Sequence, residues 1–129
     1  MPATYLILPE KRLIIERFTG STGLEEIKNL LGRVFADPLF DRSFHTLMDF
    51  TKAVLKTGLE EVALLCEFIS SVAGGCIGST AIIAAGPMGT ALAMLISKGL
   101  SFFTPSEVFS TGEAALDFLG LDLSGIPDL

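Results

Sequence analysis

The chain has 129 residues, half of them hydrophobic, and its formal net charge is −6 at pH 7. A chain of this length buries enough surface to fold as one domain around a single core, and a composition so rich in hydrophobic residues excludes an intrinsically disordered protein. The nine Lys and Arg residues are outnumbered by fifteen Asp and Glu residues and form no basic patch, which excludes binding of nucleic acid through its phosphates.

The chain is predicted to open with a β-hairpin and a helix. Two β-type runs at residues 4–8 and 13–19 are separated by a turn at residues 9–12. The segment Thr22-Gly23-Leu24-Glu25 has the form of a capping box, in which Thr22 caps a helix and the glutamate reaches back to the backbone. We expect this helix to end at Asp37-Pro38, because proline interrupts helices.

The middle of the chain is predicted to contain two strands and two helices. A short apolar run at residues 45–50 is long enough only for a strand. A second capping box, Thr57-Gly58-Leu59-Glu60, begins a helix with Thr57 as its cap. The uncharged, β-branched run at residues 80–85 is typical of a strand buried on both faces of a parallel sheet. Gly86-Pro87 then begins a third helix, since proline is tolerated in a first turn.

The last strand and helix are predicted at residues 107–109 and 112–119, and residues 121–129 are expected to form an irregular tail. The order of elements is therefore ββαβαβαβα. Strands that alternate with helices form a largely parallel sheet with right-handed crossovers, and the opening hairpin adds an antiparallel strand. We therefore expect a single α/β domain over residues 1–120, with a mixed, mostly parallel sheet and four helices.

A long uncharged stretch raises the question of a membrane span. No residue from Phe68 to Ser97 is charged, and a stretch of this length can cross a bilayer. Gly74-Gly75, Gly78 and Gly86-Pro87 divide it into short pieces, as loops do. We therefore expect a helix end, a buried strand and another helix rather than a spanning segment, while peripheral contact with a membrane stays open. The amino terminus does not resemble a signal peptide, and we expect a cytoplasmic protein.

Three parts of the sequence are similar to a known family. Tyr5 to Gly20 resembles the opening hairpin of the SpoIIAA-like branch of the STAS family, whose fold is that of the bacterial anti-sigma-factor antagonists. Residues 36–41, and Val108-Phe109 together with residues 113–119, resemble later segments of the same fold. The resemblance extends to Gly120 and implies a STAS-like fold and a non-enzymatic regulatory or protein-interaction module. Some relatives are grouped with the CRAL-TRIO lipid carriers, which implies a small carrier or sensor of an apolar ligand as the alternative.

The resemblance also implies a regulatory residue at the start of the second helix. In the anti-sigma-factor antagonists, a partner kinase phosphorylates a serine in an Asp-Ser-Ser-Gly-Leu motif. The corresponding segment here is Leu55-Lys56-Thr57-Gly58-Leu59, which keeps Thr-Gly-Leu and lacks the Asp and the first Ser. Thr57 is the hydroxyl that could take this role, but the capping box predicts that it caps the helix instead of acting as a switch.

Residue types that perform catalysis are sparse. His45 lies in a predicted strand without a nearby nucleophile, and Cys66 belongs to the apolar stripe of a predicted helix. Cys76 lies in the glycine-rich residues 74–79, which precede a strand and contain no lysine, the reverse of a phosphate-binding loop. Two cysteines are too few for a zinc site or a disulfide scaffold, so we expect no metal and no cofactor. An enzyme is therefore only the third choice of function.

One edge of the predicted sheet is a candidate ligand or partner site. In an open α/β sheet, ligands bind beyond the carboxyl ends of the strands, where the loops that lead to the helices converge. The residues expected at this edge are Asp49, Thr51, Lys52, Lys56, Thr57 and Gly86. The same pattern allows Asp49 to bind its own backbone, the commoner role of an Asp at a strand end, and allows the lysines to be merely solvated.

The third predicted helix carries a candidate dimer interface. Its large apolar residues are expected to cover the sheet, namely Met88, Leu92, Leu95 and Ile96. The opposite side is then formed by Thr90, Ala93, Met94 and Ser97. A solvent-facing helix surface normally carries charge, so this uncharged side predicts a homodimer about a two-fold axis. The expected partners are a second copy of the chain and a regulatory protein, with an apolar small molecule as the alternative.

Overall fold

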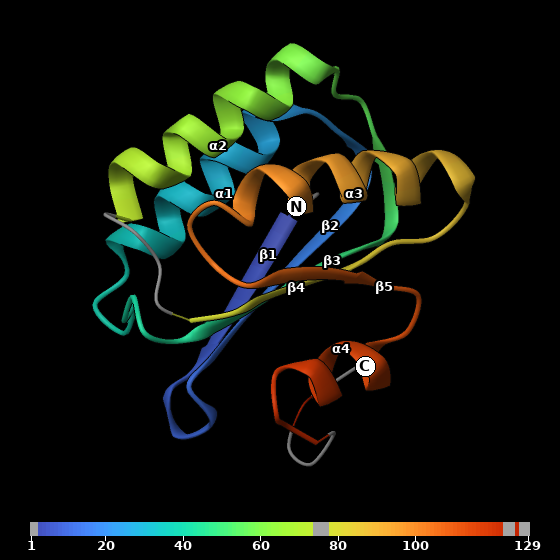
Figure 1. The fold of residues 1–129 in the computed structure, drawn as a ribbon. Coiled ribbons are helices and arrows are strands. Elements are labelled where there is room, and N and C mark those ends of the chain that lie inside the picture. Colours follow the sequence, from blue (N-terminus) through green and yellow to red (C-terminus); the bar gives the residue numbers. More distant parts are fainter. Residues whose placement is uncertain (1–2, 74–77, 123–125, 127–129) are drawn as a thin grey trace.

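The computed structural model describes residues 3–73, 78–122 and 126, which form a layered α/β arrangement (Figure 1). The strands of this part of the chain are β1 (Ala3–Leu8), β2 (Leu13–Thr22), β3 (His45–Leu55), β4 (Thr80–Ile83) and β5 (Ser106–Phe109). Its α-helices are α1 (Leu24–Ala36), α2 (Leu59–Ala73), α3 (Pro87–Leu100) and α4 (Gly112–Phe118), and a short 3-10 helix, Pro9–Lys11, joins β1 to β2. The predicted order ββαβαβαβα is confirmed.

The five strands of the described residues form one sheet in the order β1-β2-β3-β4-β5. β1 pairs antiparallel with β2, and the later pairs are parallel. Helices α1, α2 and α3 cover one face of the sheet, and α4 covers the other (Figure 1). The prediction of a mixed, mostly parallel sheet with an amino-terminal hairpin is therefore also confirmed.

The alternation of side chains along β2 divides the core into two parts. Leu13 and Ile15 point to the face that α4 covers, whereas Phe18 packs in the larger cluster beneath α1, α2 and α3. Successive side chains of a strand point to opposite faces, so Glu16 shares the face of Phe18 and lies inside the larger core. Every residue of β4 is buried, as its uncharged sequence predicted.

Helix α1 begins one residue later than its capping box predicts, and its cap is Gly23 rather than Thr22. The N–H of Gly23 donates to the Glu26 carboxylate at 2.7 Å, whereas the Thr22 hydroxyl donates to the Gly20 carbonyl at 3.1 Å. Thr22 is the last residue of β2 and is buried, so its hydroxyl is used within the end of the strand. The expectation that Thr22 caps the helix was therefore wrong.

Strand β3 extends to Leu55 and does not end at Phe50 as predicted. The pairing of β3 with β2 shifts register between Arg17 and Thr19, opposite the polar residues that follow Asp49. At this irregularity the Asp49 carboxylate accepts hydrogen bonds from the N–H and the hydroxyl of Thr51, at 2.9 and 2.7 Å. A bulge thus accommodates the polar residues without ending the strand.

The uncharged stretch between Phe68 and Ser97 is divided as predicted, because it contains the end of α2, the strand β4 and most of α3. No helix in the described part of the chain combines the length and the hydropathy needed to cross a bilayer. Residues 74–77, which include Cys76 and most of the glycine-rich segment, lie outside the described residues.

Candidate functional site

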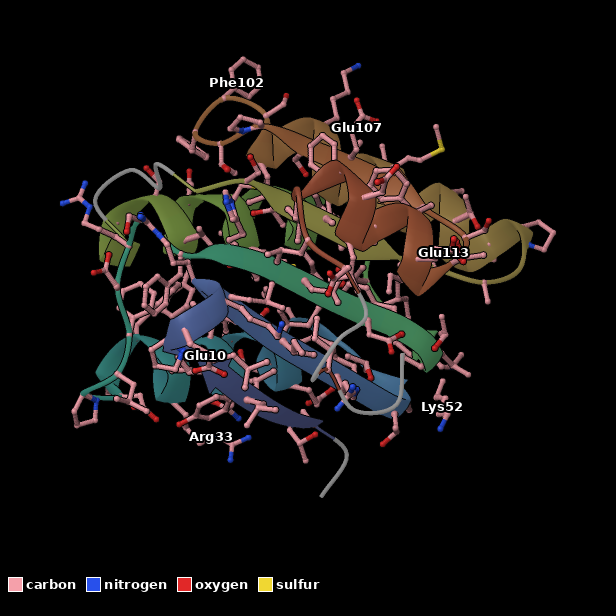
Figure 2. All side chains as sticks on the ribbon, turned by 90° about the horizontal axis from the view of Figure 1, so that it is seen from below. Glu10, Arg33, Lys52, Phe102, Glu107 and Glu113 are labelled. Atoms are coloured by element: carbon pink, nitrogen blue, oxygen red, sulfur yellow. The ribbon has the colours of Figure 1, made fainter. Side chains whose placement is uncertain are left out.

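The residues predicted at the carboxyl edge of the sheet do not form a single site. Asp49, Thr51 and Lys52 lie within β3 and not in a loop, and Lys52 points away from the protein (Figure 2). The carboxylate of Asp49 binds the backbone and hydroxyl of Thr51, which is the local role that the sequence left open. Asp49 is level with Ile83 at the end of β4, but β3 continues as far as Leu55, about 20 Å further at about 3.3 Å per residue.

The other predicted edge residues belong to two separate loops. The N–H of Lys56 donates to the Thr22 carbonyl at 2.7 Å, which holds it at the far ends of β2 and β3. Gly86 follows β4 with a φ of 75°, a left-handed conformation that favours glycine. Its carbonyl accepts the first hydrogen bond of α3, from the N–H of Thr90 at 3.0 Å. Lys56 thus follows the end of a strand, whereas Gly86 precedes a helix in a different loop.

Thr57 does not cap α2, because the helix begins at Leu59 and Gly58 holds the cap position. The Gly58 carbonyl accepts from the N–H of Val62 at 3.0 Å, and the Glu61 carboxylate accepts from the N–H of Gly58 at 3.0 Å. Each Thr-Gly-Leu-Glu-Glu segment offers two capping registers, Thr with the first Glu or Gly with the second. The structure uses the second register in both, so the prediction of Thr57 as an N-cap was wrong.

Helix α3 packs on the sheet with its small residues, which corrects the predicted dimer face. Ala93 and Ser97 are buried, together with Ile96 and Leu100. The Ser97 hydroxyl lies 2.9 Å from the Ser106 hydroxyl of β5, so the helix and the sheet are in close contact here. The large side chains were expected to face the sheet because hydrophobicity is the stronger signal in a sequence. Small residues, however, allow α3 to approach the sheet more closely.

The exposed side of α3 therefore carries different residues from those predicted. Of the predicted dimer face, Met94 is 59% exposed and Thr90 is half-buried. Met88 and Leu95, which were expected to cover the sheet, are 72% and 37% exposed. The outer surface of the helix is thus more apolar than the sequence predicted.

An apolar groove, called here the α2–α3 groove, runs between these two helices and has a volume of about 690 Å³. Its lining residues are Leu59, Val62, Ala63, Cys66, Glu67, Ser70, Ser71, Leu95, Lys98, Gly99, Phe102 and Phe103. Phe102, one of these lining residues, is 83% exposed and projects from the protein (Figure 2). Glu67 and Lys98, one on each helix, are the charged residues that line it.

A second hollow, called here the Glu16 cavity, lies between the sheet and the helix layer and has a volume of about 40 Å³. Its polar lining residues are Glu16, Arg42, Thr46, Ser70, Thr80 and Thr104. Its apolar lining residues are Leu31, Phe35, Phe40, Phe44, Met48, Ile69, Leu100 and Phe103. Because β3 and β4 begin here, the cavity lies at the amino-terminal edge of the parallel strands, opposite the edge that the sequence predicted.

Glu16 is the feature of this cavity that sequence reasoning missed. Its side chain is 1% exposed, and its Oε1 atom has no hydrogen-bond partner among the described residues. Burial raises the pKa of this carboxyl to about 8, so the folded protein holds it mainly as a neutral carboxylic acid at pH 7. The signal was present in the alternation of β2, which puts Glu16 on the same face as Ile14 and Phe18.

His45 and Cys66 both have structural roles. The Nδ1 atom of His45 accepts a hydrogen bond from the N–H of Ser79 at 2.9 Å, and burial together with the charge of Arg12 lowers the pKa of this imidazole. Cys66 is buried as predicted, and its burial raises the pKa of the thiol. Within the described ranges, no three His, Cys, Asp or Glu side chains are placed together to hold a metal ion.

Solved structures provide the comparison with known proteins. No family model matches the sequence, and no curated protein matches it. The chain is similar to a DUF3478-family protein with a SpoIIAA-like fold from Shewanella loihica PV-4, with a TM-score of 0.58, 18% identity and coverage of 91% of this chain and 93% of that one. It also matches the unphosphorylated anti-sigma factor antagonist SpoIIAA, with a TM-score of 0.49, 14% identity and coverage of 92% and 97%. The first likeness establishes that this chain has a SpoIIAA-like α/β fold.

Proposed function

We propose that the chain is a non-enzymatic regulatory module of the STAS type that acts by binding protein through the α2–α3 groove. The observation that carries this proposal is the exposure of large apolar side chains along the groove, above all Phe102 at 83% and Leu59 at 70%. Exposed apolar side chains that gather around one groove mark an interaction surface. This non-enzymatic role is supported by two observations: His45 accepts a hydrogen bond from the backbone, and the thiol of Cys66 is buried, so neither is set up as a base or a nucleophile.

The occupant that fits the groove best is a second copy of the chain. Glu67 on α2 and Lys98 on α3 give the groove one negative and one positive side. Two copies related by a two-fold axis can place Glu67 of each opposite Lys98 of the other, so the surface complements itself. The homodimer predicted from α3 is thus retained as a proposal, with Leu95 and Phe102 in place of the buried Ala93 and Ser97.

The first test measures the mass of the native protein and of Phe102→Glu by light scattering at about 50 µM, where a stable dimer is assembled. We expect a native dimer that Phe102→Glu dissociates, because the change puts like charges into an apolar interface at a cost of about 2 kcal/mol or more. Leu39→Glu is the matched control, since Leu39 is 55% exposed in the loop that precedes β3 and lies outside the groove. It should stay dimeric.

The outcomes separate the possible occupants. A native monomer, or a dimer unchanged by Phe102→Glu, would show that the groove does not pair two copies. Dissociation by Leu39→Glu to the same extent would show that added charge, and not the groove, controls association.

A further inference from the structure

Three helices end over the Glu16 cavity. Leu31 and Phe35 line it from the carboxyl-terminal part of α1, Ile69 from the last turns of α2 and Leu100 from the end of α3. The three helices run in the same sense and end above the edge where β3 and β4 begin (Figure 1). Because the carboxyl end of a helix carries a partial negative charge, the helix side of the cavity favours a cation.

On the sheet side of the cavity, Glu16 favours a ligand that donates a hydrogen bond. Its Oε1 atom has no hydrogen-bond partner among the described residues, and a buried polar atom left in this state destabilises the fold. A ligand that donates a hydrogen bond to this oxygen recovers the loss. The other charged residue that lines the cavity is Arg42, which is exposed to solvent, unlike Glu16.

Aromatic rings decide what kind of cation fits. Phe35, Phe40, Phe44 and Phe103 all line the cavity, and the faces of aromatic rings attract ammonium groups. A metal ion such as Ca²⁺ or Mg²⁺ requires several oxygen ligands, whereas most of this wall is hydrocarbon. An organic ammonium group, which carries its own apolar part, matches both the carboxyl and the walls.

We propose that the Glu16 cavity binds the ammonium group of a small primary alkylamine, which donates a hydrogen bond to the Glu16 carboxylate while the acid proton of Glu16 is released to the solvent. The cavity volume of about 40 Å³ exceeds the roughly 10 to 15 Å³ that one water molecule needs on the same measure, so the cavity admits the ammonium group and its first carbon. The rest of the alkyl chain lies against the apolar lining residues of the cavity. Ser70 and Phe103 line both this cavity and the α2–α3 groove, but Glu16 lines the cavity and not the groove, so substitution of Glu16 tests the ligand site apart from the dimer surface.

Titration calorimetry and amide NMR with n-butylammonium chloride up to about 50 mM test the proposal, since this range saturates a millimolar site. We expect saturable binding at neutral pH, with shifts of the amide signals of Glu16, Thr46 and Thr80. Glu16→Gln keeps the size and the hydrogen-bonding groups of the protonated acid but cannot become negative. It should weaken binding by more than about tenfold, because a charge-assisted hydrogen bond becomes a neutral one.

Two further probes sharpen the result, and they serve equally if Glu16→Gln does not fold. n-Butanol has the same length without the charge and should bind at least about tenfold more weakly than n-butylammonium. Potassium chloride at the same ionic strength should produce no shifts at the cavity. Absence of n-butylammonium binding, equal binding by Glu16→Gln, equal binding of n-butanol, or displacement of the amine by K⁺ would each overturn the proposal.

Discussion

Glu16 gives the protein a component of stability that depends on pH. Burial raises the pKa of its carboxyl from 4.5 to about 8, so between these pH values the folded chain keeps a proton that the unfolded chain releases. The stabilisation is therefore complete below pH 4.5 and is lost as the pH rises through 8. This direction is opposite to that of a carboxylate held by hydrogen bonds, such as Asp41, whose pKa the Ser43 hydroxyl and N–H lower.

The variant Glu16→Gln isolates this component, because glutamine does not titrate. Between pH 4.5 and 8, the free energy of unfolding of the native protein should fall relative to that of Glu16→Gln by up to about 1.4 kcal/mol per pH unit. Urea unfolding of both proteins at several pH values across this window measures the difference. The lowered pKa values of Asp37 and Asp41 act below it and are common to both proteins. A difference that stays constant with pH would contradict the burial of a titrating Glu16.

Two threonines near helix starts are expected to contribute differently to the free energy of unfolding. The Thr111 hydroxyl accepts a hydrogen bond from the N–H of Ala114 at 3.2 Å, so Thr111→Ala should lower the free energy of unfolding by about 1 kcal/mol. Thr57 precedes the cap of α2, so Thr57→Ala should change the free energy of unfolding by less than about 0.5 kcal/mol. Chemical unfolding of the two variants compares them directly. Equal losses would restore Thr57 as a cap and would mean that α2 begins one residue earlier.

At the scale of elements, Gly99 controls the approach of α3 to α2. A methyl group on Gly99 would overlap the sulfur of Cys66, whereas one on Gly89 of the same helix would meet open space. Gly89→Ala should therefore stabilise the protein by about 0.5 to 1 kcal/mol through helix propensity, and Gly99→Ala should destabilise it by about 1 to 3 kcal/mol through overpacking. Thermal and chemical unfolding measure both effects.

A double-mutant cycle assigns the cause of the Gly99→Ala effect. In a Cys66→Ala background the sulfur is absent, so Gly99→Ala should lose most of its cost. The same background should leave the gain from Gly89→Ala unchanged. If Gly99→Ala destabilises the protein equally with and without the sulfur, the contact with Cys66 is not the reason that a larger side chain at position 99 is unfavourable.

The elements that the sequence predicted best are those with a strict hydrophobic period. Stripes at helical spacing located α1 and α2, and the uncharged run at residues 80–85 located β4. β3 was predicted too short because the polar residues after Asp49 looked like a loop, and only pairing with β2 shows that they form a bulged strand. On the inward face of α3, Ile96 is buried as predicted, but Ala93 and Ser97 were assigned to the wrong side because small residues give a weak hydrophobic signal.

At the scale of the molecule, the sequence predicted the layers and the sheet but not the place of the cavity. The cavity brings together side chains from α1, α2, α3 and three strands, as well as Phe40 and Arg42 from the loop before β3. No short motif encodes such an assembly, because its members are separated along the chain and most are ordinary core residues. Glu16 alone was visible as a carboxylate at a core position, and only the surrounding packing shows that its oxygen lacks a partner.

Because its pairing with β4 ends at Asp49, the long strand β3 has an open edge that matters when copies of this protein meet in crowded solution. Beyond Asp49, β3 has β2 on one side and, within the described part of the chain, no paired strand on the other. An open strand edge of this kind is a template for strand addition and aggregation, and Val54, 59% exposed, would strengthen the attraction. Lys52 and Lys56 are both exposed on this segment, and positive side chains on an edge repel an incoming identical strand. The two lysines that looked like ligands for a partner are therefore well placed to prevent the sheet from growing into a fibre.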